Sequence, residues 1–196
     1  LNDTSKTTIL VDCCIGEDLI ADYCDVNEEF RNRLPVDSEE RPYVDAFILT
    51  HRHEDHLKGL QPHFHLGAPE DYPEPKENDN KKIFIREMWS SHNFWKPSSE
   101  KYPLCENAKA FNKEMKRRVK LFEDSLKIQD EGNRAIIIGK DPDGKTDNLG
   151  EVNYDIGDVF SKINNKNISS KISGLILSPI VQQENEEDEC FTDKNR

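Results

Sequence analysis

Apolar residues gather into short runs along the chain, and polar stretches separate these runs. Five runs are rich in Ile, Leu, Val or Phe and predict strands, at residues 7–14, 44–50, 82–86, 134–139 and 174–180. Apolar positions at helical spacing predict helices over 17–34 and 107–127, and a short helix beginning within 55–60. Strands therefore alternate with helices, which predicts a layered α/β (α+β) fold.

The length of 196 residues predicts one domain that covers 1–196. Pro and acidic residues dominate 67–80, which predicts a loop, and the polar, acidic stretch 182–196 predicts a mobile tail. Residues 141–144 read DPDG and resemble the start of a calcium loop. The later ligands of such a loop do not follow, so this segment is interpreted as a turn.

The formal net charge of -12 excludes binding of a polyanion through the overall field of the chain. A nucleic-acid role would need metal ions or a local basic patch. The helix expected over 107–127 carries a dense basic run of Lys113, Lys116, Arg117, Arg118 and Lys120. A solvated helix face is one interpretation, and phosphate contacts by Lys116 and Arg117 are the other.

No apolar run is as long as a membrane span, which predicts a protein that does not enter a membrane. The five cysteines lack the spacing of a disulfide framework, and the adjacent Cys13 and Cys14 are interpreted as buried free thiols. Free thiols favour a cytoplasmic location.

Three histidines and an aspartate follow the strand expected at 44–50, namely His51, His53, Asp55 and His56. Imidazole nitrogens suit zinc, and a carboxylate adds charge for harder ions. Four ligands so close in sequence can serve two adjacent metals, with Asp55 also orienting the nucleophile. The helical HExxH zinc site is excluded because His56 is three residues after His53, whereas that site needs four.

Residues 50–59 read THRHEDHLKG and match the T-H-x-H-x-D-H-x-x-G signature of metallo-β-lactamase-fold hydrolases at every fixed position. Residues 9–12 (ILVD) resemble the family's upstream strand, which ends in an acid. Among members of the family, the chain is most similar to the hydrolase domain of the DNA-uptake competence channel and its soluble relatives.

The resemblance implies a role for each matched residue. His51 and His53 would bind the first metal, and Asp55 and His56 the second. Asp12 would buttress the metal loop, and Gly59 would let the short helix pack closely on this loop. Two zinc ions fit these ligands best, and manganese is an alternative.

The family supplies further ligands downstream, for which His92 and Asp158 are the candidates in this chain. His92 lies beside Trp89, Phe94 and Trp95, and a histidine packed against aromatic residues is the alternative interpretation. Asp158 follows Gly157 without a long buried strand before it, so a turn is its alternative interpretation. His63 and His65 also have metal-like spacing, but packing or capping is favoured for both.

The family fold is an αββα sandwich of two similar halves. The resemblance implies that this chain holds the first half plus an insertion, so that the domain is incomplete. The rest of the site would then come from the missing C-terminal half of the same polypeptide, or the chain would form a homo-oligomer.

The resemblance implies a hydrolase that uses a metal-bound hydroxide, acting on phosphodiester bonds of a nucleic-acid or nucleotide substrate. Two alternatives stay open. One is a thioester, lactone or β-lactam hydrolase with the same site, and the other is a catalytically incomplete metal-binding or partner-binding module.

Overall fold

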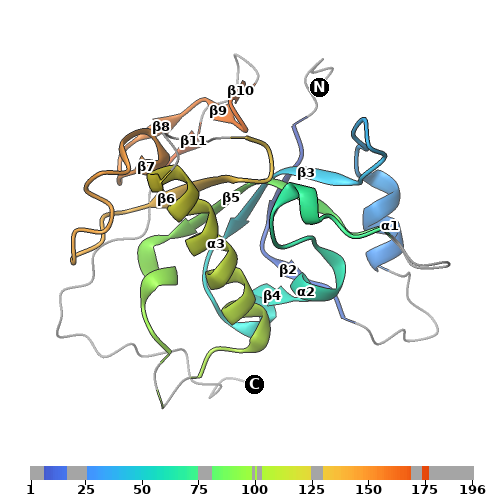
Figure 1. The fold of residues 1–196 in the computed structure, drawn as a ribbon, viewed down its shortest axis with the longest axis horizontal. Coiled ribbons are helices and arrows are strands. Elements are labelled where there is room, and N and C mark those ends of the chain that lie inside the picture. The colour runs from blue at the N-terminus through green and yellow to red at the C-terminus, as the bar shows by residue number, and fades with distance from the viewer. Residues whose placement is uncertain are drawn as a thin grey trace.

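A parallel sheet of five strands forms the centre of the molecule (Figure 1). The computed structural model describes residues 7–16, 26–74, 81–98, 100, 103–124, 130–168 and 174–176. The strands lie in the order β1 (Ile9–Val11), β3 (Tyr43–Leu49), β5 (Phe84–Ser91), β6 (Arg134–Ile138) and β7 (Asn153–Tyr154), and all neighbours are parallel. Parallel neighbours require crossover connections, which here include helices. The expected α/β class is confirmed.

Helices and short strand pairs flank the sheet. The long helix α3 (Glu106–Asp124) crosses one face (Figure 1), where the rings of Phe111 and Phe47 are 6.1 Å apart. On the sheet's other side, Trp89 stacks on Tyr154 at 5.6 Å and contacts Phe160 at 4.8 Å. The core therefore lies on both sides of β5, which is buried along nearly its whole length.

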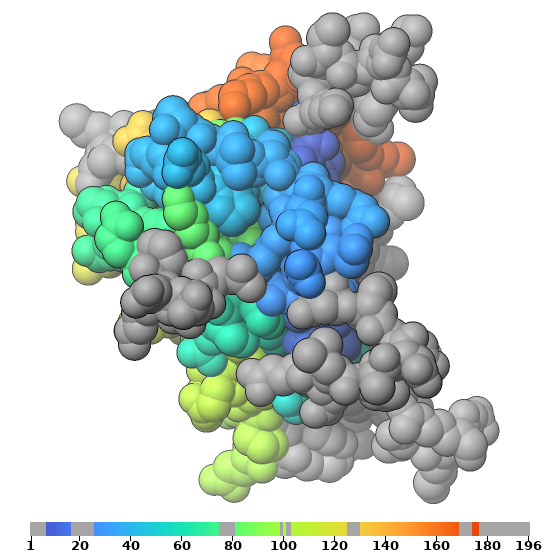
Figure 2. Space-filling model, turned by 90° about the vertical axis from the view of Figure 1, so that its right-hand side faces the viewer, coloured from blue at the N-terminus to red at the C-terminus, as the bar shows by residue number. Residues whose placement is uncertain are grey.

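The remaining elements are short. The helices are α1 (Val26–Arg33) and α2 (Leu60–His63), with single 3-10 turns η1 (Glu54–His56), η2 (Pro69–Asp71), η3 (His92–Trp95) and η4 (Gly150–Val152). Three strand pairs lie outside the main sheet: β2 (Cys13–Cys14) with β4 (Leu57–Lys58), β8 (Val159–Phe160) with β11 (Gly174–Leu175), and β9 (Lys162–Ile163) with β10 (Lys166–Asn167). On the side shown in Figure 2, α1 and the residues after it (blue) form much of the surface, and α1 buries none of its residues.

The strand expected at 7–14 is divided at Asp12, whose φ of 55° is left-handed. The chain pairs with β3 before this residue and with β4 after it. The apolar sequence of this run is typical of a buried strand, but this interpretation is wrong for β1, which forms an edge of the sheet and exposes Ile9 and Val11. Cys13 is buried as expected, but Cys14 is exposed, and both are free thiols.

The strands and helix expected at 44–50, 107–127 and 134–139 are confirmed as β3, α3 and β6 within the described residues. The strand at 82–86 is confirmed but underestimated, since β5 continues to Ser91. The extension was not predicted because it contains polar residues such as Glu87 and Ser90. Glu87 is buried because it accepts hydrogen bonds from Arg134 Nε at 2.7 Å, Trp89 Nε1 at 2.6 Å and Asn164 N at 3.1 Å.

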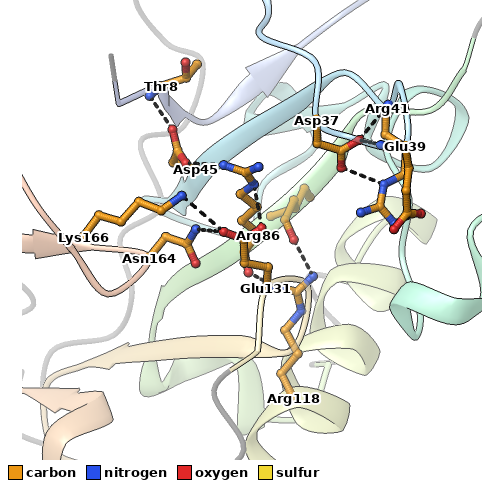
Figure 3. A network of polar contacts seen from close by, with 11 residues as sticks. Thr8, Asp37, Glu39, Arg41, Asp45, Arg86, Arg118, Glu131, Asn164 and Lys166 are labelled. Atoms are coloured by element: carbon orange, nitrogen blue, oxygen red, sulfur yellow. Dashed lines mark hydrogen bonds and ion pairs between the residues drawn. The ribbon is translucent and has the colours of Figure 1, made fainter. Parts of the chain in front are cut away.

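A second polar network joins the main sheet to the neighbouring loops (Figure 3). Arg86 donates to Asp45 Oδ1 at 3.0 Å and forms an ion pair with Glu131 at 3.1 Å. Asn164 donates to the same Glu131 at 2.8 Å. Buried charges are tolerated only when paired in this way, so the network fixes the loop that carries Glu131 against the sheet.

The basic run on α3 is only partly a solvated face. Arg118 is 1% exposed and donates to Glu114 at 2.7 Å and to the carbonyl oxygens of Ile85 and Arg134 at 3.1 and 3.0 Å. Its long side chain therefore ties α3 to the neighbouring strands β5 and β6. The interpretation of the whole run as a surface feature is wrong at this residue.

Other expectations fall partly or wholly outside the described residues. These are 17–25 of the first helix, 75–80 of the loop, 125–127 of the long helix, 177–180 of the last strand, and the acidic tail at 182–196. Within the described part of the chain, none of the helices is long and apolar enough to span a membrane.

Candidate metal centre

The signature loop begins where β3 ends, at the carboxyl edge of the parallel sheet. Val11 pairs with Ile48, and Leu49 pairs with Ser90, so the residues after β1, β3 and β5 leave the sheet side by side. Asp12, His51 and His92 follow these three strand ends. In open parallel sheets, ligands characteristically bind beyond the carboxyl ends of the strands.

Asp12, at the end of the neighbouring strand β1, holds this loop in place through its side chain. Its carboxylate accepts from the Thr50 backbone N–H at 2.8 Å and from the Thr50 hydroxyl at 2.6 Å, and lies 2.7 Å from His56 Nδ1. Burial raises the pKa of Asp12, but the bonds from Thr50 and His56 outweigh this effect and hold the pKa below its usual value. The left-handed backbone of Asp12 is tolerated by a short polar side chain and turns the carboxylate into the loop.

The three histidine rings of the loop lie close together. The centroids of His51 and His56 are 3.5 Å apart, and those of His51 and His53 are 5.1 Å apart. The Thr50 hydroxyl is 2.9 Å from His51 Nδ1. Burial, followed by the neighbouring His56 and His53, lowers the pKa of His51, which favours the neutral imidazole that metals bind.

Asp55 completes the predicted ligand set at the surface. Its side chain is 74% exposed, and its Oδ2 lies 3.5 Å from Nε2 of His56. Among the described residues, however, no three or more His, Cys, Asp or Glu side chains form a group that could hold a metal ion. The loop thus brings the four predicted ligands into one neighbourhood without arranging them as a coordination shell.

Gly59 allows the chain to turn tightly after the loop. Its φ of +87° is left-handed, and a Cβ there would lie 2.7 Å from the carbonyl oxygen of Ile15. Only glycine meets both conditions without strain. The segment after β2 can therefore approach the start of α2. The close neighbour of Gly59 is thus Ile15, whereas the packing expected of Gly59 was between the short helix and the metal loop.

His92 follows β5 and is buried in η3. It forms a hydrogen bond with the backbone of Ile138, at the end of β6, while its Nδ1 is buried without a hydrogen-bond partner. Burial and the nearby Lys96 lower the pKa of His92. The lowered pKa favours the neutral form of His92, which lies at the same sheet edge as His51 and has a nitrogen without a hydrogen-bond partner.

Asp158 and Arg117 are engaged locally. Asp158 lies in the turn between β7 and β8, where its carboxylate accepts from the Asp155 backbone N–H at 2.7 Å. Arg117 donates to Glu114, to Asn133 at 2.7 Å and to the carbonyl oxygen of Gly132 at 3.0 Å. Lys116 is exposed on α3. None of these contacts joins the three residues to the signature loop.

The two histidines beyond the loop belong to α2 and the segment after it. His65 is buried, and its Nε2 lies 2.8 Å from the carbonyl oxygen of Ala68, which fits the favoured packing interpretation. His63 is the last residue of α2 and is partly buried. Together they line no described site with His51.

Two residues of the loop region had no role in the sequence-based prediction. Thr50 bonds the Asp12 carboxylate with both its N–H and its hydroxyl. Arg52 donates to the carbonyl oxygen of Lys96 at 3.1 Å and so links the loop to η3. Thr50 could have been identified as a fixed position of the signature, whereas nothing in the sequence pairs Arg52 with residue 96.

Comparisons of the chain with family models, with curated proteins and with solved structures found no match.

Proposed function

We propose that this chain is a metal-dependent hydrolase of the metallo-β-lactamase fold that cleaves phosphodiester bonds of nucleic acid or nucleotides. The observation that carries the proposal is the 2.7 Å contact between Asp12 and His56 Nδ1. Metal-binding histidines commonly donate their other ring N–H to a carboxylate, which orients the ring. Asp12 thus leaves Nε2 of His56 as the nitrogen that faces a ligand.

The donor set fits a late divalent ion such as zinc. Two ligand atoms on a tetrahedral zinc, each about 2.0–2.1 Å from the ion, are about 3.3 Å apart. His56 Nε2 and Asp55 Oδ2 are 3.5 Å apart, which is close to this separation. The exposed Asp55 side chain can rotate to remove the small difference between these two distances.

His92 adds a second supporting observation. A buried nitrogen without a partner is costly, at about 1–3 kcal/mol, and Nδ1 of His92 is such an atom. Binding of an ion at the carboxyl edge would satisfy it, since its other nitrogen is oriented by the Ile138 backbone. His92 is therefore the better supported of the two downstream candidates, and Asp158 remains a turn residue in this proposal.

The chemistry follows from the placement of these groups. Bound divalent ions would lower the pKa of water and offset the charge that develops on phosphoryl oxygens. His51 and His53 would hold one ion, and Asp55 and His56 the other. Asp55 is exposed to solvent, so it can also accept a hydrogen bond from the attacking water and orient it.

Hydrolysis of bis-p-nitrophenyl phosphate with added zinc or manganese tests the proposal. His53→Ala and Asp55→Ala should each lower kcat at least about 100-fold, because a ligand and the water-orienting carboxylate are lost. Glu54→Gln is the matched control, since Glu54 is exposed in the same loop and occupies a variable position of the signature. Equal activity of the wild-type protein and the two ligand variants would refute the proposal.

Parallel assays with a thioester, a lactone and a β-lactam test the other hydrolase class. Rapid turnover of one of these substrates without phosphodiester cleavage would assign the site to that class.

A module without catalytic activity is the second candidate, and it is favoured by the absence of a formed metal-ligand group among the described residues. Elemental analysis after extensive dialysis separates the two. One or two metal ions retained per chain supports the hydrolase, and well under one supports the module.

A further inference from the structure

Arg52 lies inside the signature loop, between His51 and His53, and its side chain is half-buried. One nitrogen, Nη1, donates to the carbonyl oxygen of Lys96 at 3.1 Å. The guanidinium therefore has four further N–H donors beside the candidate metal centre.

Several of the described arginines form ion pairs with carboxylates. Arg41 pairs with Asp37 at 2.8 Å, Arg86 with Asp45 at 3.0 Å and Arg134 with Glu87 at 2.7 Å. In the described part of the chain, no Asp or Glu carboxylate forms an ion pair with Arg52, although Glu54 and Asp55 are close to it in sequence. A half-buried cation without a counter-charge is costly unless an anion joins it.

The element that Arg52 contacts adds more positive charge and an aromatic surface. Lys96 is exposed at the end of η3, and its ammonium is close enough to lower the pKa of His92. Trp95 is half-buried, and Lys145 Nζ lies 6.0 Å from the centroid of its ring. Cations and an aromatic ring therefore meet at the sheet edge from which His51 and His92 also project.

The geometry points to Arg52 and Lys96 as a clamp for a phosphate of a single-stranded nucleic acid, adjacent to the phosphate at the metal centre. The inference rests on the proposed function of the loop and identifies what holds its substrate. Arginine binds phosphate through two parallel N–H bonds, and Lys96, whose carbonyl oxygen Arg52 contacts, adds a second positive charge. Because the chain carries a net charge of -12, such a local cluster is required to attract a polyanion.

This clamp replaces α3 as the expected phosphate surface. Arg117 is bonded to Glu114, Asn133 and Gly132, so four of its five N–H donors are already used. Arg118 is buried. The exposed lysines of α3, Lys113 and Lys116, therefore serve as matched controls of the same charge.

The test is the fluorescence anisotropy of a fluorescein-labelled oligothymidylate with phosphorothioate linkages, titrated with protein in zinc and in EDTA. Arg52→Gln should raise Kd about tenfold or more, because a bidentate charge-assisted contact is lost. Lys96→Ala should raise it several-fold and reduce the slope of log Kd against log salt by about 1. The paired control, Lys113→Ala with Lys116→Ala, should change Kd less than about twofold.

Lys96→Ala keeps the backbone carbonyl that Arg52 contacts, so it decides the question if Arg52→Gln disturbs the fold. Oligonucleotide affinity at the wild-type level in Lys96→Ala, or an equal loss in the α3 control, would overturn the clamp. If the wild-type protein cleaves nothing while Lys96→Ala still weakens binding, the clamp stands and the proposed hydrolysis fails.

Discussion

Asp12→Asn isolates the contribution of one carboxylate to the candidate metal centre. Asparagine also tolerates left-handed backbone, so the φ of 55° at this position should persist. Its amide oxygen can still accept from the Thr50 N–H. The amide group that replaces the other oxygen cannot accept from the Thr50 hydroxyl and His56 Nδ1, which approach at 2.6 and 2.7 Å.

Two charge-assisted hydrogen bonds are therefore lost, each worth about 1.5–3 kcal/mol when buried. The His56 and Asp12 side chains are 25% and 19% exposed, so water replaces part of this contribution. We expect a loss of about 2–3 kcal/mol in the free energy of unfolding, or roughly 5–10 °C in Tm. Zinc affinity should fall about 10–100-fold because His56 loses the partner that orients it.

Competition with a chromophoric chelator measures zinc affinity, and circular dichroism measures thermal unfolding. Glu54→Gln is the control for each. The folded-state pKa of Asp12 lies below 3.8, so its stabilising contribution is complete above about pH 3.8 and is lost as the pH falls through the lower folded value. A zinc affinity equal to that of the wild-type protein would refute the orienting role, and a wild-type Tm at pH 7 would refute the stabilising one.

Two further substitutions test the packing around the site. Gly59→Ala should destabilise the protein by about 2–4 kcal/mol in chemical denaturation. The added Cβ would lie 2.7 Å from a backbone oxygen, and the φ of +87° is strained for alanine. A change below about 1 kcal/mol would contradict this close approach. Arg118→Met should cost about 2–4 kcal/mol, because the buried Glu114 loses this partner and keeps only Arg117, and adding Glu114→Leu should restore part of the loss. An additive double variant would show that the two residues do not act as a pair.

The sequence predicted the parts of the fold in which side-chain polarity and burial agree. The apolar runs of β3 and β6 and the helical spacing of α3 are such cases. Prediction was less successful where charges are buried. Glu87 and Arg134 pair across adjacent strands, and the residues that neutralise them are distant in sequence, so a local pattern cannot reveal that they lie inside.

The residues of the candidate site also differ in how far the sequence predicts them. Motif spacing alone identified His51 to His56 as one cluster, and the acid after the first strand was correctly expected near it. The contacts of Arg52 with η3 depend on the register between β3 and β5, because Leu49 pairs with Ser90 and this pairing places the two following loops together. Such neighbours come from strand pairing rather than from the composition of either loop.

Because the chain turns at Asp12, residues 9–14 pair with the strands on both sides of the histidine loop. The segment pairs with β3 where the chain enters this loop and with β4 where the chain leaves it. Both ends of the loop are thus held by one short segment. The conformational entropy of closing the loop is therefore lost when these strands pair, and not when a ligand binds. Substitutions within the loop can change its chemistry while this support stays in place, whereas inserting a residue would force one of the two pairings to slip. The spacing of the signature is therefore expected to tolerate far less change in length than in side-chain identity.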